Sequence, residues 1–219
     1  MYDIILSFIT AFLLTYFAIP SIINIAKVKK LVDLPDERRS HDEATPSLGG
    51  IGIFGGLLFS VIMWTPFNVF GDLQYVLCSL VIIFLIGAKD DILPMSPNKK
   101  ILGEIFAAVI LVFKANVKIT SLYGIFNIYD LHPVASALFS IFSILVIINA
   151  FNLIDGINGL SGSIGTLIAV TFGTWFFLVQ RIELSLVAFA LAGSLIAFLK
   201  YNYTPAKIFM GDTGALIVG

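Results

Sequence analysis

Long apolar stretches alternate with short polar ones along the whole chain. A helix needs about 20 apolar residues to cross a bilayer, and seven stretches approach that length. They are residues 4–26, 48–64, 73–87, 101–117, 134–151, 160–179 and 184–199. An eighth stretch begins at Thr213 and runs to the last residue, Gly219. The pattern predicts an all-α, polytopic transmembrane helical bundle of seven spans plus the start of an eighth.

The eighth stretch is too short to cross a membrane. A helix that ends inside lipid leaves backbone groups unpaired, so we expect it to continue past Gly219. Residues 1–219 then form a single transmembrane domain that is incomplete at the C-terminus. The first span has no basic residue before it and no small-residue cleavage site. We therefore interpret it as a retained anchor rather than a signal peptide.

Composition excludes an ordinary soluble domain. Hydrophobic residues make up 58% of the chain and charged residues 12%, against about 25% charged residues in a typical soluble domain. The mean hydropathy is +1.00. No basic arm is present that would bind nucleic acid, and we expect no nucleic-acid partner. The single cysteine, Cys78, excludes a disulfide framework, and its apolar surroundings predict a packing role.

The distribution of basic residues predicts the orientation. If the spans alternate, one set of loops covers residues 27–47, 88–100, 152–159 and 200–212, and it carries ten of the 13 Lys and Arg residues. The positive-inside rule places this set in the cytosol and the N-terminus outside. On the other side, the alternation around Ser121–Gly124 predicts a small hairpin outside the membrane.

Acidic residues stand at the ends of three spans on the predicted cytosolic side. Asp90 and Asp91 close the third span, Asp155 follows the fifth, and Asp212 precedes the eighth. A single acid at a helix end is usually solvated, but each of these lies in apolar sequence with a glycine nearby. Two carboxylates about 5 Å apart repel each other by about 3 kcal/mol at an effective dielectric near 20. A cation would offset that repulsion, and oxygen donors favour Mg²⁺, or alternatively Mn²⁺, over zinc.

Glycines beside these acids have two interpretations. Small residues allow either close approach of a substrate or close helix packing. For Gly156 and Gly159, which flank the loop after Asp155, we expect substrate approach. For Gly162 and Gly165 we expect helix packing.

Basic residues near the acids fit an anionic substrate. Lys100 begins the fourth span and can reach the same pocket as Asp91, although snorkelling to the interface is an equal alternative. Arg38 and His41 lie in the longest cytosolic loop. They could contact phosphate or belong to a solvated loop. The chain contains no Walker-type phosphate loop.

Together these motifs resemble the polyprenyl-phosphate N-acetylhexosamine-1-phosphate transferases, which are glycosyltransferase family 4. Within that family the resemblance is greatest to the bacterial undecaprenyl-phosphate GlcNAc-1-phosphate transferase branch. The motifs that carry it are Val32-Asp33-x-Pro35-x-x-Arg38-Arg39-x-His41, Thr45-Pro46-x-x-Gly49-Gly50, Asp90-Asp91 with Ser96-Pro97 and Lys100, Asn152-x-x-Asp155-Gly156-x-Asn158-Gly159-Leu160, Asn202-x-x-Pro205-Ala206 and Phe209-Met210-Gly211-Asp212-x-Gly214.

The resemblance implies an enzyme of the bacterial inner membrane with its active site facing the cytosol. It would transfer N-acetylhexosamine 1-phosphate, most simply GlcNAc-1-phosphate, from a UDP-N-acetylhexosamine to undecaprenyl phosphate and release UMP. The partners implied are these two substrates and the lipid bilayer, and a homodimer is left open. The family also has a later cytosolic loop with a histidine-rich motif, which the sequence to Gly219 does not reach.

The resemblance also implies roles for single residues. The metal ligands would be Asn152 and Asp212, and the catalytic residues Asp90, Asp91 and Asp155, with one of the first two acting on the lipid phosphate and Asp155 lying at the reacting phosphorus. The substrate-binding residues would be Lys100, Asn158, Asn202, Arg38 and His41. Direct attack and a phospho-enzyme both remain open. Glu104 departs from the pattern, since relatives usually have glutamine there.

Other functions fit less well. The phospho-MurNAc-pentapeptide transferases of the same family are the nearest alternative, although their first cytosolic loop should lack the Arg38-Arg39-x-His41 arrangement. An intramembrane prenyltransferase would space its acids as Asn-x-x-x-Asp-x-x-x-Asp, which is absent. A transporter would carry acids in the middle of the membrane and internal repeats. A purely structural membrane protein is a further alternative that fits less well.

Overall fold

The computed structural model describes residues 2–31, 45–66, 71 and 73–219. Every predicted span corresponds to one helix in these ranges. The α-helices are α1 (Tyr2–Lys29), α2 (Gly49–Trp64), α3 (Leu73–Ile92), α4 (Pro97–Phe113), α5 (Pro133–Ile154), α6 (Leu160–Leu178), α7 (Ile182–Asn202) and α8 (Gly211–Val218). The all-α fold is therefore confirmed, including the start of an eighth helix.

The helix boundaries follow from local chemistry. Both α4 and α5 begin with a proline, Pro97 and Pro133, at the position where the missing N–H has no helical partner anyway. Helix α3 continues past the predicted end at Gly87 to Ile92. The acidic pair Asp90-Asp91 thus lies on the last turn of α3, beyond the apolar part of the helix.

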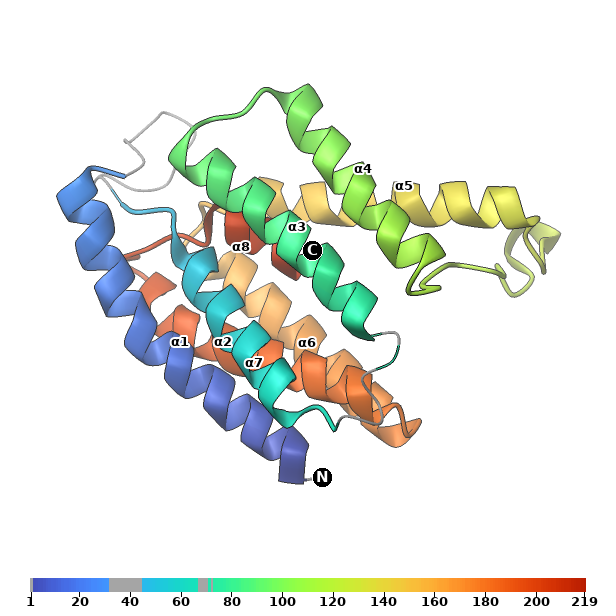
Figure 1. Ribbon diagram of the computed structural model, residues 1–219, viewed down its shortest axis with the longest axis horizontal. Helices are drawn as coiled ribbons and strands as arrows, with labels where there is room; N and C mark the ends of the chain where they lie inside the picture. The colour runs from blue at the N-terminus through green and yellow to red at the C-terminus, as the bar shows by residue number, and fades with distance from the viewer. Residues whose placement is uncertain (1, 32–44, 67–70, 72) are drawn as a thin grey trace.

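Helix α7 is the centre of the bundle and packs against α1, α2 and α6 (Figure 1). Small residues allow these helices to approach closely. A Cβ atom added at Gly162 would lie 2.7 Å from Leu199 of α7, and one added at Gly165 would lie 2.7 Å from Val218 of α8. The helix-packing interpretation of these two glycines is confirmed.

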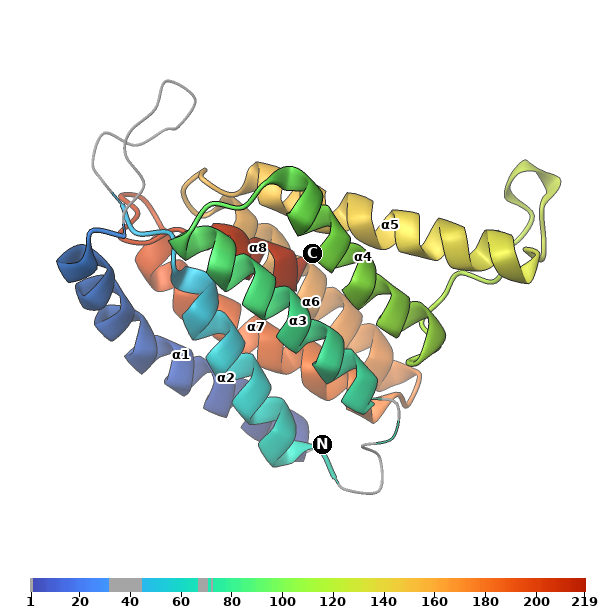
Figure 2. The same cartoon turned by 45° about the horizontal axis from the view of Figure 1, so that its top comes forward.

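Helix α8 lies inside the bundle, where it packs against α2, α3 and α5 (Figure 2). Its contact with α2 is unusually close, because a Cβ atom on Gly50 would lie 2.0 Å from the backbone nitrogen of Gly214. This insertion brings the N-terminus of α8 beside the last turn of α3 and the end of α5. Three segments that are distant in the sequence thereby meet at one end of the bundle.

Helix α5 extends away from α1, α2 and α7, and the loop before it stands at its far end in both views (Figures 1 and 2). In this loop Ser121 and Asp130 form an antiparallel bridge. The Leu122 N–H donates to the Tyr129 carbonyl at 2.9 Å, and a short 3-10 helix, η2 (Ile125–Asn127), forms the tip. The predicted hairpin is confirmed as this narrow pairing.

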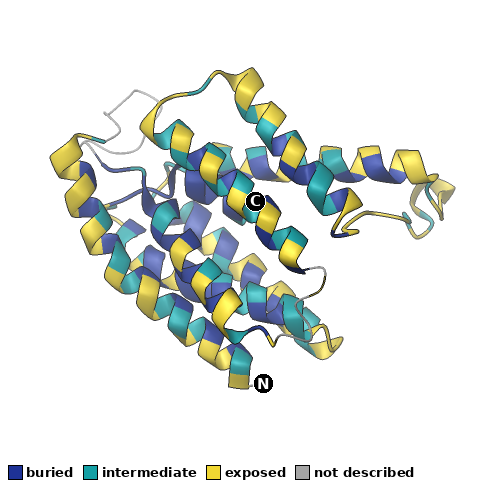
Figure 3. Ribbon diagram, viewed as in Figure 1, coloured by how far each residue is buried: buried dark blue, intermediate teal, exposed yellow. Residues whose placement is uncertain are grey.

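The outer surface of the helices is apolar. Large side chains such as Phe17 on α1, Phe142 on α5 and Trp175 on α6 are more than half exposed, and exposed residues follow the outer faces of the helices (Figure 3). Within the described ranges, four helices, α1, α5, α6 and α7, are long and apolar enough to cross a membrane, and α2 is a shorter apolar helix. The chain is a multi-pass membrane protein. Cys78 lies on this exposed surface, so its predicted packing role is wrong.

Candidate active site

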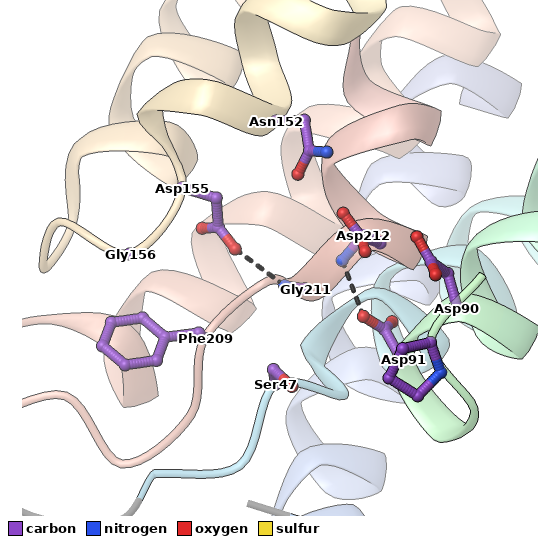
Figure 4. A pocket seen from close by; sticks show the side chains of 10 residues that line it. Ser47, Asp90, Asp91, Asn152, Asp155, Gly156, Phe209, Gly211 and Asp212 are labelled. Atoms are coloured by element: carbon purple, nitrogen blue, oxygen red, sulfur yellow. Dashed lines mark hydrogen bonds between the residues drawn. The ribbon is translucent and has the colours of Figure 1, made fainter. Parts of the chain in front are cut away.

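A cavity of about 290 Å³ lies at the end of the bundle where α3, α5 and α8 meet (Figure 4). All four predicted acids line it, which confirms that the ends of three separate helices bring carboxylates to one place. Its lining residues are Ser47, Asp90, Asp91, Pro94, Asn152, Asp155, Gly156, Phe209, Gly211 and Asp212.

Asp91 joins α3 to the beginning of α8. Its carboxylate accepts hydrogen bonds from the Asp212 N–H at 2.8 Å, from the Thr213 N–H at 3.0 Å and from the Thr213 hydroxyl. Unpaired N–H groups at a helix N-terminus attract an anion of this kind. Burial raises the pKa of Asp91 to about 7, while these hydrogen bonds act in the opposite direction. Asp91 therefore fixes the position of Asp212 in the cavity.

Lys100 connects two further carboxylates. Its ammonium lies 2.9 Å from Oδ2 of Asp90 and 2.7 Å from Oδ1 of Asp212. The other oxygen of Asp90 accepts a hydrogen bond from the Met95 N–H at 2.6 Å. All three side chains are mostly shielded from solvent, with 11–26% of each exposed. Of the two predicted alternatives for Lys100, reaching the pocket and snorkelling to the interface, the structure shows the first. Its charge neutralises part of the acidic cluster.

Asp155 ends α5 and connects it to α6 and α8. Its Oδ1 accepts from the Ser161 hydroxyl at 2.8 Å, and its Oδ2 accepts from the Gly211 N–H at 2.8 Å. Burial raises the pKa of Asp155, and these hydrogen bonds oppose the rise. Both oxygens therefore already have a donor, which holds the carboxylate at a fixed place on the cavity wall.

Two glycines shape the cavity. Gly211 has φ +72°, and a Cβ atom there would lie 1.8 Å from the Ser47 carbonyl oxygen. Only glycine fits this position. Gly156 has φ +99°, and a Cβ atom would meet nothing within 4 Å. Gly156 therefore lines open space, whereas Gly159 is the N-cap residue before α6 and lies outside the cavity lining.

The polar residues predicted to bind substrate or metal occupy different environments. Asn152 lines the cavity (Figure 4). Asn202 is completely buried: its Oδ1 accepts from the Gly159 N–H and its Nδ2 donates to the Ile208 carbonyl, each at 2.9 Å. It therefore positions the loop after α5 rather than facing the cavity. Asn158 also lies outside the lining, with a buried Oδ1 that has no partner among the described residues. Arg38 and His41 lie outside the described residues.

The donor set fits a cation that is held largely by its substrate. Among the described residues, no group of three or more His, Cys, Asp and Glu side chains is arranged to hold a metal ion alone. Asn152 has an amide oxygen and Asp212 a carboxylate, and both residues line the cavity. Mg²⁺ commonly takes one or two protein ligands and completes its shell with water and phosphate oxygens. These two side chains fit such a site.

Several residues of the site had no clear signal in the sequence. Thr213 and Ser161 hold Asp91 and Asp155 through their hydroxyl groups. Ser47 and Phe209 line the cavity. All four lie within or beside the motifs around the acids, but nothing in the spacing of those motifs distinguishes a hydroxyl that supports a carboxylate from one that faces solvent.

Comparison with known proteins gives one family and several relatives. The family model described as "Glycosyl transferase family 4" matches residues 73–219. A Bacillus subtilis (strain 168) protein, named "Probable undecaprenyl-phosphate N-acetylglucosaminyl 1-phosphate transferase", is 29% identical over 100% of this chain and 61% of its own length. A phospho-N-acetylmuramoyl-pentapeptide-transferase of Enterococcus faecalis is 30% identical over 99% of this chain and 73% of its own length.

A second phospho-N-acetylmuramoyl-pentapeptide-transferase, from Clostridium beijerinckii, is 53% identical over 55 residues, which are 25% of this chain and 17% of that protein. The chain thus spans less than two thirds of the Bacillus subtilis relative and a small part of the Clostridium one. The relatives that cover almost the whole chain carry two different substrate names.

Proposed function

The chain belongs to glycosyl transferase family 4, and on that premise we propose that it transfers N-acetylhexosamine 1-phosphate from a UDP-sugar to undecaprenyl phosphate. The observation that carries this proposal is the meeting of Asp90, Asp91, Asp155 and Asp212 with Lys100 and Asn152 at one cavity. The products are a lipid diphosphate sugar and UMP. The proposed donor is UDP-GlcNAc.

The proposed location follows from the two substrates. A polyprenyl phosphate is confined to the bilayer, and a nucleotide sugar is confined to water. The cavity lies where α3 ends, and Lys100 at the beginning of α4 pairs with two of its carboxylates, while Lys89 and Lys99 are near these residues in the sequence. The excess of basic residues in the loops at this end supports a cytosolic orientation in a bacterial inner membrane.

In the reaction, an oxygen of the lipid phosphate attacks the phosphorus that carries the sugar. The bond from that phosphorus to the oxygen of the uridine-bearing phosphate breaks, and UMP leaves with the electron pair. Such transfers depend mainly on positioning and on charge stabilisation. Lys100 would donate to a phosphate oxygen, since it is the cation already placed between Asp90 and Asp212.

Asn152 and Asp212 would hold Mg²⁺, or Mn²⁺ in its place, and the ion would neutralise charge on the donor diphosphate. Asp90 is the better candidate of the acidic pair for contact with the lipid phosphate. Asp91 is less suited to that contact, because it accepts three hydrogen bonds from the first residues of α8.

The hydrogen bonds of Asp155 support direct transfer over a phospho-enzyme. Both of its oxygens accept from donors on neighbouring segments, and this lowers its reactivity as a nucleophile. Direct transfer predicts that radiolabelled UMP does not exchange into UDP-GlcNAc when the lipid acceptor is absent. Exchange at a rate near that of turnover would contradict it.

The donor is tested by comparing two substrates. The full chain in detergent, with undecaprenyl phosphate and Mg²⁺, receives either UDP-GlcNAc or UDP-MurNAc-pentapeptide, and mass spectrometry identifies the lipid product. The proposal expects product from UDP-GlcNAc. Product from UDP-MurNAc-pentapeptide alone would select the second candidate, which the relatives of Enterococcus and Clostridium favour by name. Product from neither donor would contradict the proposed reaction.

A further inference from the structure

A cationic and aromatic cluster lies on the outer face of α1 and α7, apart from the cavity. The Lys200 ammonium donates to the Tyr16 hydroxyl and lies 4.1 Å from the centre of the Tyr16 ring and 5.6 Å from that of Tyr201. The lining of the cavity includes no residue of α1 or α7. In Figures 1 and 2, α1 lies on the flank of the bundle opposite α5.

The charge of Lys200 has no acidic partner among the described residues, whose ion pairs involve Lys100 and Arg181. Lys200 is exposed, and the side chains around it are apolar and face outward. Leu13 and Phe17 flank Tyr16 on α1 with 45% and 69% of their surfaces exposed, and Ile196 lies one turn before Lys200 on α7 with 37% exposed. Lys200 lies on the last turn of α7, and a lysine near the cytoplasmic membrane surface attracts anionic headgroups by about 1 kcal/mol, or about fivefold in affinity.

The ammonium is held in place rather than extended. A snorkelling lysine stretches toward water on a flexible stem, but this one is folded over two aromatic rings. An ammonium has three N–H donors and a phenol has one O–H donor. One ammonium donor goes to the Tyr16 oxygen, and the Tyr201 hydroxyl donates to the Tyr16 carbonyl at 3.2 Å. Lys200 is exposed and its ammonium donates no other hydrogen bond among the described residues, so two of its N–H groups remain for a further acceptor.

We propose that Lys200, held in place by the Tyr16 hydroxyl, binds the phosphate group of an anionic membrane lipid. The free oxygens of a phosphodiester can accept from the remaining ammonium N–H groups, and Leu13, Phe17 and Ile196 provide apolar contacts for the first carbons of the acyl chains. A zwitterionic lipid would carry its own cation to the same place, where Lys200 would repel it. The site is therefore selective for net negative headgroups, and it does not depend on the proposed transferase reaction.

The test uses the full chain in nanodiscs of phosphatidylcholine alone or mixed with phosphatidylglycerol. Native mass spectrometry counts the lipids that stay bound, and thermal unfolding gives the melting temperature. The wild type should retain phosphatidylglycerol in preference to phosphatidylcholine and melt at a higher temperature in the mixed discs. In the Lys200→Gln variant, the preference for phosphatidylglycerol over phosphatidylcholine should fall about fivefold. Lys200→Arg should keep most of that preference.

Two controls decide between a site and a general surface effect. Tyr16→Phe keeps the ring and removes the hydroxyl, so it should weaken phosphatidylglycerol binding without changing the phosphatidylcholine result. Lys27→Gln removes an exposed lysine of α1 instead of the α7 lysine and should change nothing. Equal retention of the two lipids by the wild type, or equal losses in Lys200→Gln and Lys27→Gln, would overturn the proposal. Stabilisation by inorganic phosphate without lipid would overturn the assignment to a lipid.

Discussion

Asp212 is the single residue on which most of the proposed chemistry depends. It lies at the beginning of α8, pairs with Lys100, and is held in place by the bonds that Asp91 accepts from residues 212 and 213. Because its own carboxylate does not support other segments through backbone bonds in the way that Asp91 and Asp155 do, substitution should affect chemistry more than folding.

We expect Asp212→Asn to lower UMP release by about 100-fold or more, since a charge that stabilises the transferring phosphate is lost. UMP release from UDP-GlcNAc with undecaprenyl phosphate and Mg²⁺ measures this. The matched control is Asp130→Asn, which makes the same change in the loop before α5 and should leave turnover unchanged. Wild-type turnover in the Asp212 variant would contradict its assignment as a metal ligand.

Substitution of Gly211 tests whether the close backbone contact beside Asp212 requires glycine. Alanine at φ +72°, with its Cβ directed at the Ser47 carbonyl, should cost about 2 kcal/mol or more. Gly211→Ala should therefore lower both the melting temperature and UMP release. Gly55→Ala is the control, because a Cβ atom there would meet nothing within 4 Å and alanine favours a helix by about 0.5–1 kcal/mol. Equal melting temperatures for Gly211→Ala and the wild type would contradict the close contact.

At the scale of helices, α4 and α5 share a polar contact that the proposed chemistry does not use. Glu104 is completely buried one turn after Lys100, and its Oε2 accepts from Asn149 Nδ2 at 2.8 Å. Its Oε1 has no partner among the described residues. Asn149 in turn lies one turn before Asn152 on α5. The pair therefore joins the two helices directly behind the site.

A double-mutant cycle measures this contact. Asn149→Leu should lower the free energy of unfolding by about 1–3 kcal/mol, because it leaves both oxygens of Glu104 buried and unpaired. Adding Glu104→Leu should recover most of that loss, since replacing both polar partners by apolar groups is often nearly neutral. Unfolding of the single and double variants in detergent gives the coupling energy. Additive losses would show that the two side chains do not depend on each other.

The sequence predicts the helices well because lipid imposes a simple rule on them. Continuous apolar stretches that approach the required length predicted each helix to within a few residues, and the acids at their ends predicted the cavity. The contacts across helices could not be read in the same way. Glu104 and Asn149 are far apart in the sequence, and the burial of Asn202 depends on where Gly159 and Ile208 happen to meet it.

For the whole molecule, the central consequence of the fold is that the cavity and several of the basic residues lie at the same end of the helix bundle. The cavity, Lys100 and the ends of α1 and α7 with their lysines lie at one end, while the loop with η2 lies at the far end of α5 (Figure 1). A soluble nucleotide sugar can reach the proposed site only if the cavity end faces the compartment that contains it. Orientation is therefore a requirement of the proposed function.

Cysteine labelling tests that orientation. With Cys78→Ser as the background, Lys207→Cys places a thiol in the exposed loop between α7 and α8, and Asn127→Cys places one in the exposed loop before α5. A membrane-impermeant maleimide should label the Asn127→Cys protein in spheroplasts and the Lys207→Cys protein only after the membrane is opened. Labelling of Lys207→Cys in sealed spheroplasts would show that the orientation is the opposite of the one predicted. It would also separate the cavity from cytosolic UDP-sugars, so the proposed reaction would fail with it.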